Sequence, residues 1–216
     1  MKRFKTLLII ITITISVNSQ IRSGISPFRF VPDMYIGANF GPNLFVSEGI
    51  GQYFLNGSVG LSESIFLGYN FTQIFGAKII GSFGSMSWPL QPVSLIDVNN
   101  DKKFSIMSMS VEGLLNVSNI FGYYNLNKPV DFVVFGGLGF ISREKALYKN
   151  EFIGLLFKGG AQFDYRINYK FDINVNFTGN IMADSFNENV VGVNFDAFPE
   201  LKVGLTYHIR GGNGFR

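Results

Sequence analysis

The chain has 216 residues, of which 47% are hydrophobic, 24 are phenylalanine and none is cysteine, so a disulfide framework and thiol chemistry are excluded. The formal net charge is +3, but three of the 18 Lys and Arg residues (Lys2, Arg3 and Lys5) lie before an apolar N-terminal stretch. Without them 18 − 3 = 15 basic residues balance 15 acidic ones, so a nucleic-acid partner has no electrostatic support.

Residues 1–19 have the organisation of a secretory signal peptide. Basic residues precede an apolar and Ser/Thr stretch from Leu7 to Val17, which is too short to cross a bilayer as a stable helix. Val17 and Ser19 are small enough for the positions before a cleavage site, so we expect cleavage after Ser19. The alternative is a single N-terminal membrane anchor. No later run of about 18 apolar residues predicts a transmembrane helix.

After an irregular lead-in at 20–32, the region 33–210 contains eight segments in which apolar and polar residues alternate, followed by a tail at 211–216. Alternation with a period of two indicates strands with one apolar and one polar face. Pro42 and Asn43 are expected to end the first strand. The connection at 118–129 is expected to be of intermediate length. The predicted strands are 33–41, 62–72, 75–88, 105–117, 130–143, 152–166, 170–182 and 200–209.

The seventh segment has the clearest pattern. One parity is apolar apart from Gly179 and contains Phe171, Ile173, Val175, Phe177 and Ile181. The other parity is polar and contains Asp172, Asn174, Asn176, Thr178 and Asn180. The eighth segment repeats the pattern, with Leu205 and Tyr207 on its apolar parity. The third contains an exception, because Ile80 falls on the polar parity.

The composition of the two parities favours a membrane barrel over a soluble one. The apolar parity has almost no charge in mid-strand, as lipid requires, and the polar parity mixes charges with Gly, Ser, Asn and Thr, as a crowded interior requires. The sequence therefore predicts an all-β, eight-stranded antiparallel up-and-down transmembrane barrel in the outer membrane, with Phe171, Ile173, Val175, Phe177, Ile181, Leu205 and Tyr207 facing lipid. A secreted lipocalin-like barrel is the alternative.

The lengths of the connections predict an orientation. The segments 44–60, 89–103, 144–151 and 184–198 would lie at one end of such a barrel, and those near 73, 118–129 and 167–170 at the other. Outer-membrane barrels have long outer loops and short periplasmic turns, so we expect the first set outside. The connection at 118–129 is an exception among the short turns at its end of the barrel.

Six charged residues on the polar parities are expected to form a network in the lumen. One interpretation is structural: the charges pair with one another away from water. The other is functional: they line a gated ion path. An eight-stranded barrel is narrow enough for side chains to fill, so a wide pore is not expected. The six residues are Lys78, Glu112, Lys158, Asp164, Arg166 and Asp172.

No catalytic, cofactor or metal site is predicted. The only histidine, His208, lies on the inward parity near the periplasmic end of the last strand, where a hydrogen-bonded structural role is the better interpretation. The oxygen-bearing run at Asp97, Asn99, Asn100 and Asp101 lacks the full calcium-loop pattern, and a solvated loop is the better interpretation.

Four short strings, NVSNIFGYYN, DFVVFGGLGF, DSFN and GLTYHIRGGNGF, resemble the eight-stranded outer-membrane barrels of the OmpA-like class found in Bacteroidota. The resemblance covers about residues 33–216 and implies the same barrel fold. Larger members of that class carry a peptidoglycan-binding domain after the barrel. This chain stops at Arg216, so tethering to the cell wall is not expected.

These observations together predict a monomeric barrel that is not an enzyme, with a structural or surface-interaction role in the cell envelope. The expected partners are outer-membrane lipids and lipopolysaccharide, and the barrel-assembly machinery during insertion. The alternatives are a narrow gated channel for ions or small solutes and, because neighbouring classes of small barrels include such enzymes, a lipid-modifying enzyme.

Overall fold

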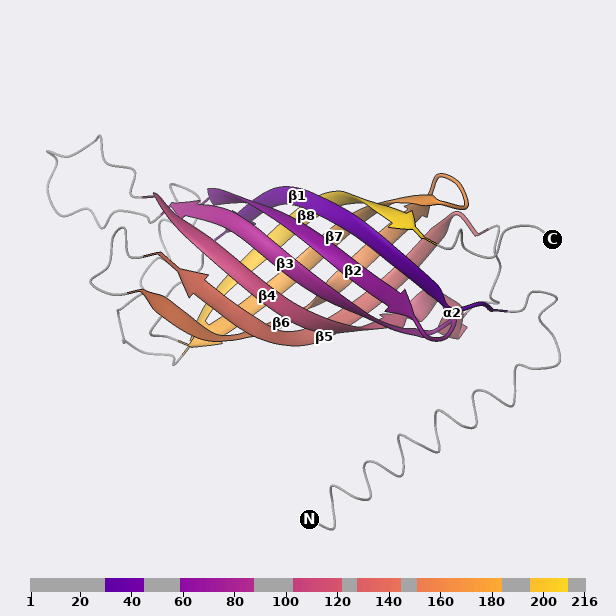
Figure 1. The fold of residues 1–216 in the computed structure, drawn as a ribbon, viewed down its shortest axis with the longest axis horizontal. Helices are drawn as coiled ribbons and strands as arrows, with labels where there is room; N and C mark the ends of the chain where they lie inside the picture. The colour runs from indigo at the N-terminus through magenta and orange to yellow at the C-terminus, as the bar shows by residue number, and fades with distance from the viewer. Residues whose placement is uncertain are drawn as a thin grey trace, which may run out of the picture.

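A computed structural model describes residues 30–44, 59–87, 103–121, 128–144, 151–183 and 195–209. Eight consecutive strands pair antiparallel, and the last pairs with the first, so the described segments form a closed up-and-down barrel, as predicted. Figure 1 shows the strands strongly tilted against the long axis of the barrel. The elements are β1 (Asp33–Leu44), β2 (Val59–Asn70), β3 (Phe75–Ser87), β4 (Lys103–Asn116), α2 (Val117–Phe121), β5 (Val130–Arg143), β6 (Phe152–Arg166), β7 (Phe171–Ala183) and β8 (Phe195–His208).

The alternation in sequence becomes an alternation between the two sides of the barrel wall. In β7, Asn174 and Asn180 point into the lumen and are buried, whereas Val175 and Phe177 point outward and are exposed. Successive strand residues point to opposite faces, so a strict period of two gives each strand one polar inner side and one apolar outer side.

The two ends of the barrel differ. At the turn end, where β2, β4 and β6 finish, side chains close the connections: Thr72 Oγ1 accepts hydrogen bonds from the amides of Ile74 and Phe75, at 3.2 and 2.8 Å. Asn168 Oδ1 does the same for the amides of Lys170 and Phe171, at 2.8 and 3.0 Å. The loop end is where β1, β3, β5 and β7 finish, and the connections that begin there lie largely outside the described residues.

The first strand does not stop at Pro42, which corrects the sequence prediction. β1 continues to Leu44 and stays in register with β2, where Pro42 pairs with Leu61. On its other side, the pairing with β8 runs to Phe40 and resumes at Asn43 in the same register. The proline therefore falls at an interruption of one ladder, where its missing N–H leaves no hydrogen bond unmade.

Two strand starts differ from the prediction by three residues or more. β2 begins at Val59 instead of residue 62, and β8 begins at Phe195 instead of residue 200. The earlier start of β8 includes Pro199, which pairs with Gly179 of β7. Sheet pairing with an existing neighbour carries a strand through residues that have weak strand propensity on their own.

The connection between β4 and β5 contains a short helix that the sequence prediction missed. Asn116 caps α2 by accepting a hydrogen bond from the amide of Asn119 at 3.1 Å. The buried side chain of Asn119 donates to the backbone oxygen of Gln73 at 2.8 Å, and Ser118 Oγ accepts from the amide of Phe132 at 2.7 Å. These bonds fasten α2 across the turn end, where Figure 1 shows it.

The lumen also contains apolar side chains, which the expectation of a polar interior did not include. Ile80, an exception in the sequence pattern, is 5% exposed and belongs to a cluster toward the turn end. A second cluster fills the loop end. The first consists of Tyr35, Phe66, Ile80, Leu114, Val133 and Phe135, and the second of Phe104, Ile106, Ile141, Leu156, Met182 and Phe198.

Within the described ranges, the helical part of the chain is too short and insufficiently apolar to cross a membrane. The predicted signal peptide, most of the lead-in and the tail at 211–216 lie outside the described residues.

Candidate functional site

Between the two apolar clusters lies a charged layer built around Glu112. This carboxylate is 1% exposed and faces two ammonium groups, Lys78 Nζ and Lys158 Nζ, each at 3.3 Å. Both lysines are buried as well. Because the three charges have no bulk water to solvate them, each needs the others, and the arrangement holds β3, β4 and β6 together.

Strand register and one glycine explain how these three residues meet. Lys78 and Glu112 are direct partners in the β3 and β4 ladder. Between Glu112 and Lys158 lies Gly137 of β5, which is the direct partner of both. A Cβ atom at Gly137 would lie 2.7 Å from Glu112 Cγ and closer still to the backbone oxygen of Val111. The missing side chain therefore lets Glu112 reach across β5 to Lys158.

Polar contacts extend the layer along β6. Lys78 Nζ also donates to Gln162 Oε1 at 3.0 Å, and Gln162 Nε2 donates to Asp164 Oδ1 at 2.7 Å. Lys78 Nζ lies 4.5 Å from the centre of the Phe135 ring, so its charge also faces an aromatic surface. Lys78 thus connects the Glu112 pair to Asp164 and to the turn-end apolar cluster.

A second buried pair completes the layer on β8. Lys202 Nζ lies 2.9 Å from Glu200 Oε1, and the Ser62 hydroxyl donates to the same oxygen at 3.0 Å. The layer as a whole contains three basic side chains (Lys78, Lys158, Lys202) and three acidic ones (Glu112, Asp164, Glu200). The Lys and Glu members lie at ion-pair distances and Asp164 accepts a hydrogen bond from Gln162, so each of these buried groups has a polar partner.

The space left inside this layer is small. The cavity bounded by Lys78, Glu112, Lys158 and Lys202 measures about 10 Å³ as the space open to the centre of a water molecule. That is on the order of the room needed by a single water. Among the described residues, side chains therefore leave room for about one water at this level of the lumen.

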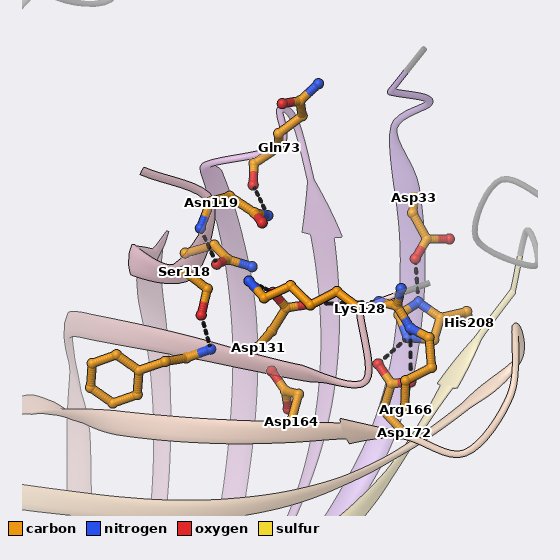
Figure 2. Close-up of polar contacts among 12 residues, drawn as sticks. Asp33, Gln73, Ser118, Asn119, Lys128, Asp131, Asp164, Arg166, Asp172 and His208 are labelled. Atoms are coloured by element: carbon orange, nitrogen blue, oxygen red, sulfur yellow. Dashed lines mark hydrogen bonds and ion pairs between the residues drawn. The ribbon is translucent and has the colours of Figure 1, made fainter. Parts of the chain in front are cut away.

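At the turn end, Arg166 joins strands through carboxylates (Figure 2). Arg166 Nη2 lies 3.7 Å from Asp131 Oδ2, and Arg166 Nε lies 3.6 Å from Asp172 Oδ1. Lys128 Nζ lies 3.0 Å from Asp131 Oδ1. Arg166 and Asp172 are direct partners in the β6 and β7 ladder, so their pairing follows from register.

His208 continues this series of contacts across the closure of the barrel. Its Nε2 lies 2.9 Å from Asp172 Oδ2, and its Nδ1 contacts Asp33 Oδ2. Asp33 begins β1, so one imidazole ring connects β7, β8 and β1 (Figure 2). The prediction that His208 is a hydrogen-bonded luminal residue is confirmed. The turn-end ion-pair chain is Lys128, Asp131, Arg166, Asp172, His208 and Asp33.

The six predicted luminal charges thus fall into two groups. Lys78, Glu112 and Lys158 form one cluster, Asp164 is linked to it through Gln162, and Arg166 and Asp172 belong to the turn-end chain. Besides His208, sequence reasoning left five charged participants out of the network: Asp33, Lys128, Asp131, Glu200 and Lys202. The spacing of Glu200 and Lys202 at i and i+2 on the inward parity was a usable signal for their pairing.

The predicted apolar set lies on the outer surface. Five of its members are between 38% and 59% exposed: Ile173, Val175, Phe177, Ile181 and Leu205. Phe171 and Tyr207 point the same way but are half-buried, because their rings pack together with centres 5.2 Å apart. Their direct partnership between β7 and β8 explains this contact.

Among the described residues, no group of three or more His, Asp or Glu side chains is placed to hold a metal ion. The oxygen-bearing run at Asp97, Asn99, Asn100 and Asp101 lies outside the described residues.

No family model matches this chain, and no curated protein matches it either. Its fold is similar to the crystal structure of neisserial surface protein A, at 14% identity and a TM-score of 0.52 over 81% of this chain and 96% of that one. Lower TM-scores relate it to OprG from Pseudomonas aeruginosa (0.48, 12% identity, 84% of this chain and 97% of that one) and to Ail from Yersinia pestis (0.46, 14% identity, 82% and 99%). The chain therefore has the closed eight-stranded barrel fold found in outer-membrane proteins.

Proposed function

We propose that this chain is an outer-membrane β-barrel that works as a monomer, with a structural or surface-interaction role in the cell envelope. The observation that carries the proposal is the reversed polarity of the barrel wall. Charged and amide side chains are buried inside, whereas large apolar side chains cover the outside of all eight strands. The short sequence strings that resemble OmpA-like barrels of the Bacteroidota type also support this assignment.

The outward apolar face is too extensive for a protein surrounded by water. Ile65, Met109, Leu138 and Phe140 are each more than 60% exposed, and comparable residues lie on every strand. Soluble monomers rarely expose contiguous apolar patches of more than a few hundred Å². In a bilayer this apolar face would contact lipid chains instead of water. The closed barrel also leaves no strand edge with unpaired backbone groups facing the lipid.

The lengths of the connections support an orientation. We place the loop end, with connecting residues 45–58, 88–102, 145–150 and 184–194, outside the cell, and the turn end with α2 in the periplasm. Residues 1–19 act as the export signal in this scheme. Insertion then requires the barrel-assembly machinery, and outer-membrane lipids and lipopolysaccharide surround the wall.

Packing of the lumen favours a structural role over the narrow channel. The charged layer leaves room for about one water, and apolar clusters fill the lumen on both sides of it. His208 does not support a lipid-modifying enzyme, because each of its ring nitrogens contacts a carboxylate at the turn end of the barrel. A substrate in the outer leaflet would lie at the other end.

Two measurements test this proposal. The folded barrel should migrate differently from the boiled protein in detergent gels, because it resists unfolding until heated. Protease added to intact cells should cut within residues 44–60 or 89–103. Migration that heat does not change, together with the absence of cleavage in these two segments, would contradict both the membrane barrel and its orientation.

A further inference from the structure

The outward face of the barrel contains one charged side chain among the strand residues whose side chains the structure describes. Glu63 of β2 is exposed, and its parity places it on the apolar side of the wall with Leu61 and Ile65. Every other described Asp, Glu, Lys or Arg within a strand points into the lumen. A carboxylate at such a position is unfavourable in hydrocarbon unless a partner compensates its charge, so Glu63 calls for a cationic partner.

The neighbours of Glu63 are aromatic on both sides. Strand register pairs it directly with Phe40 of β1 and with Phe83 of β3. The two rings are 53% and 52% exposed, so both have a free surface. Directly opposed side chains have Cβ atoms about 5 Å apart, so the carboxylate lies between two ring systems on the outer surface.

Glu63 also lies close to where the outward face becomes polar. Leu61, the next outward residue toward the loop end, pairs with Ser85, which in turn pairs with Ser105. Both serines are exposed on the outward parity. Two residues of a tilted strand correspond to about 5 Å of height, which is within reach of a lipid headgroup.

The chemistry of this position selects the class of cation. An ammonium group is attracted both by a carboxylate and by the faces of aromatic rings. A divalent ion such as Ca²⁺ instead takes six to eight oxygen ligands, of which one carboxylate supplies at most two. The combination of Glu63, Phe40 and Phe83 therefore fits an amine better than a metal ion.

We propose that Glu63, flanked by Phe40 and Phe83, binds the ammonium headgroup of a lipid in the leaflet that surrounds the loop end. The proposal rests on the membrane location given above. It adds a lipid preference, which a uniformly apolar outer wall would not have.

The test measures lipid binding to the refolded full chain in detergent by native mass spectrometry, with phosphatidylethanolamine and phosphatidylglycerol of the same acyl composition as probes. The unmodified protein should retain phosphatidylethanolamine at least fivefold better than phosphatidylglycerol. Glu63→Gln, which keeps the shape but loses the charge, should abolish the preference, and Glu63→Asp should retain part of it. Phe40→Leu and Phe83→Leu should each weaken it.

Glu151→Gln is the matched control, because Glu151 is exposed at the loop end just before β6 and has no part in the site. Its lipid preference should equal that of the unmodified protein. Equal retention of both lipids by the unmodified protein, an unchanged preference in Glu63→Gln, or a preference that requires Mg²⁺ would each overturn the inference. If the barrel inserts into vesicles and only the preference is missing, the proposed function stands. Failure to insert contradicts both.

Discussion

Adjacent glycines in β5 have different surroundings on the two sides of the barrel wall. Gly136 faces outward, and a Cβ atom there would meet nothing closer than the backbone oxygen of Lys158 at 3.8 Å. Gly137 faces inward beneath the Glu112 side chain, where a Cβ atom has no room. Two neighbouring residues of the same type therefore have different roles, and only the inner one is required by packing.

We expect Gly137→Ala to destabilise the barrel by about 1–3 kcal/mol, the usual penalty of overpacking. Gly136→Ala should leave stability unchanged or raise it by about 0.5–1 kcal/mol, because alanine loses less backbone entropy than glycine on folding. Urea unfolding in phospholipid vesicles, followed by tryptophan fluorescence, measures both variants. Equal effects of the two substitutions would contradict the separation of inner and outer faces.

Glu112 is the shared counter-charge of two buried lysines in the middle of the lumen. Glu112→Ala leaves Lys78 and Lys158 buried without their shared counter-charge, and loss of one partner of a buried ion pair costs about 3–5 kcal/mol. The same unfolding measurement tests this. Glu144→Ala, at an exposed position after β5, is the control and should change stability by less than about 0.5 kcal/mol.

Replacing the whole cluster separates charge pairing from packing. A triple variant, Lys78→Met, Glu112→Leu and Lys158→Met, removes all three charges and should recover most of the stability lost in Glu112→Ala, because no buried charge is left without a partner. If the triple variant were as unstable as Glu112→Ala, lost packing instead of uncompensated charge would explain the effect.

Between strands, the turn-end ion-pair chain closes the barrel where its first and last strands meet. Backbone hydrogen bonds already join this seam, with Ile209 N donating to Met34 O at 2.8 Å. His208 adds side-chain contacts to Asp33 of β1 and Asp172 of β7. The contacts thereby reinforce the one pair of neighbouring strands, β1 and β8, that are not consecutive in the sequence.

We expect His208→Ala to destabilise the barrel by about 1–3 kcal/mol, since it leaves two largely buried carboxylates without their shared partner. A double-mutant cycle with Asp172→Asn should show coupling of about 0.5–3 kcal/mol, because the two residues are in contact. Lys128→Ala, at the more exposed end of the chain, should cost no more than about 1 kcal/mol. Additive effects of His208→Ala and Asp172→Asn would show that the contact contributes nothing.

For the molecule as a whole, the packed lumen predicts that the barrel does not conduct ions. Planar-bilayer recordings of the purified, refolded protein should show no steps of conductance, because the charged layer has room for about one water and apolar clusters lie on both sides of it. Glu112→Ala and Lys158→Ala are informative comparisons. Steps in the unmodified protein that either substitution changes would support the gated channel instead.

Eight strands, their order and most of their faces were predictable from the sequence, since a period of two is a local property that needs no knowledge of neighbours. The strand boundaries that were predicted wrongly depend on pairing with the neighbouring strands. Pro42 continues β1 because its missing N–H falls at an interruption of the β8 ladder, and Pro199 lies within β8 because β7 pairs with it. The short helix α2 was missed because residues far from it in the sequence hold it in place, such as Gln73 in the turn between β2 and β3.

The polar and apolar parities of each strand were determined by the sequence alone, and with them the closed barrel whose apolar side faces outward. Tertiary structure decided which luminal charges meet. Lys158 reaches Glu112 only because Gly137 separates them in register, and His208 reaches Asp33 only because β8 closes on β1. The alternation of polar and apolar residues is a property of each strand's own sequence. The ion pairs depend on the register between strands, which is set only when the barrel closes.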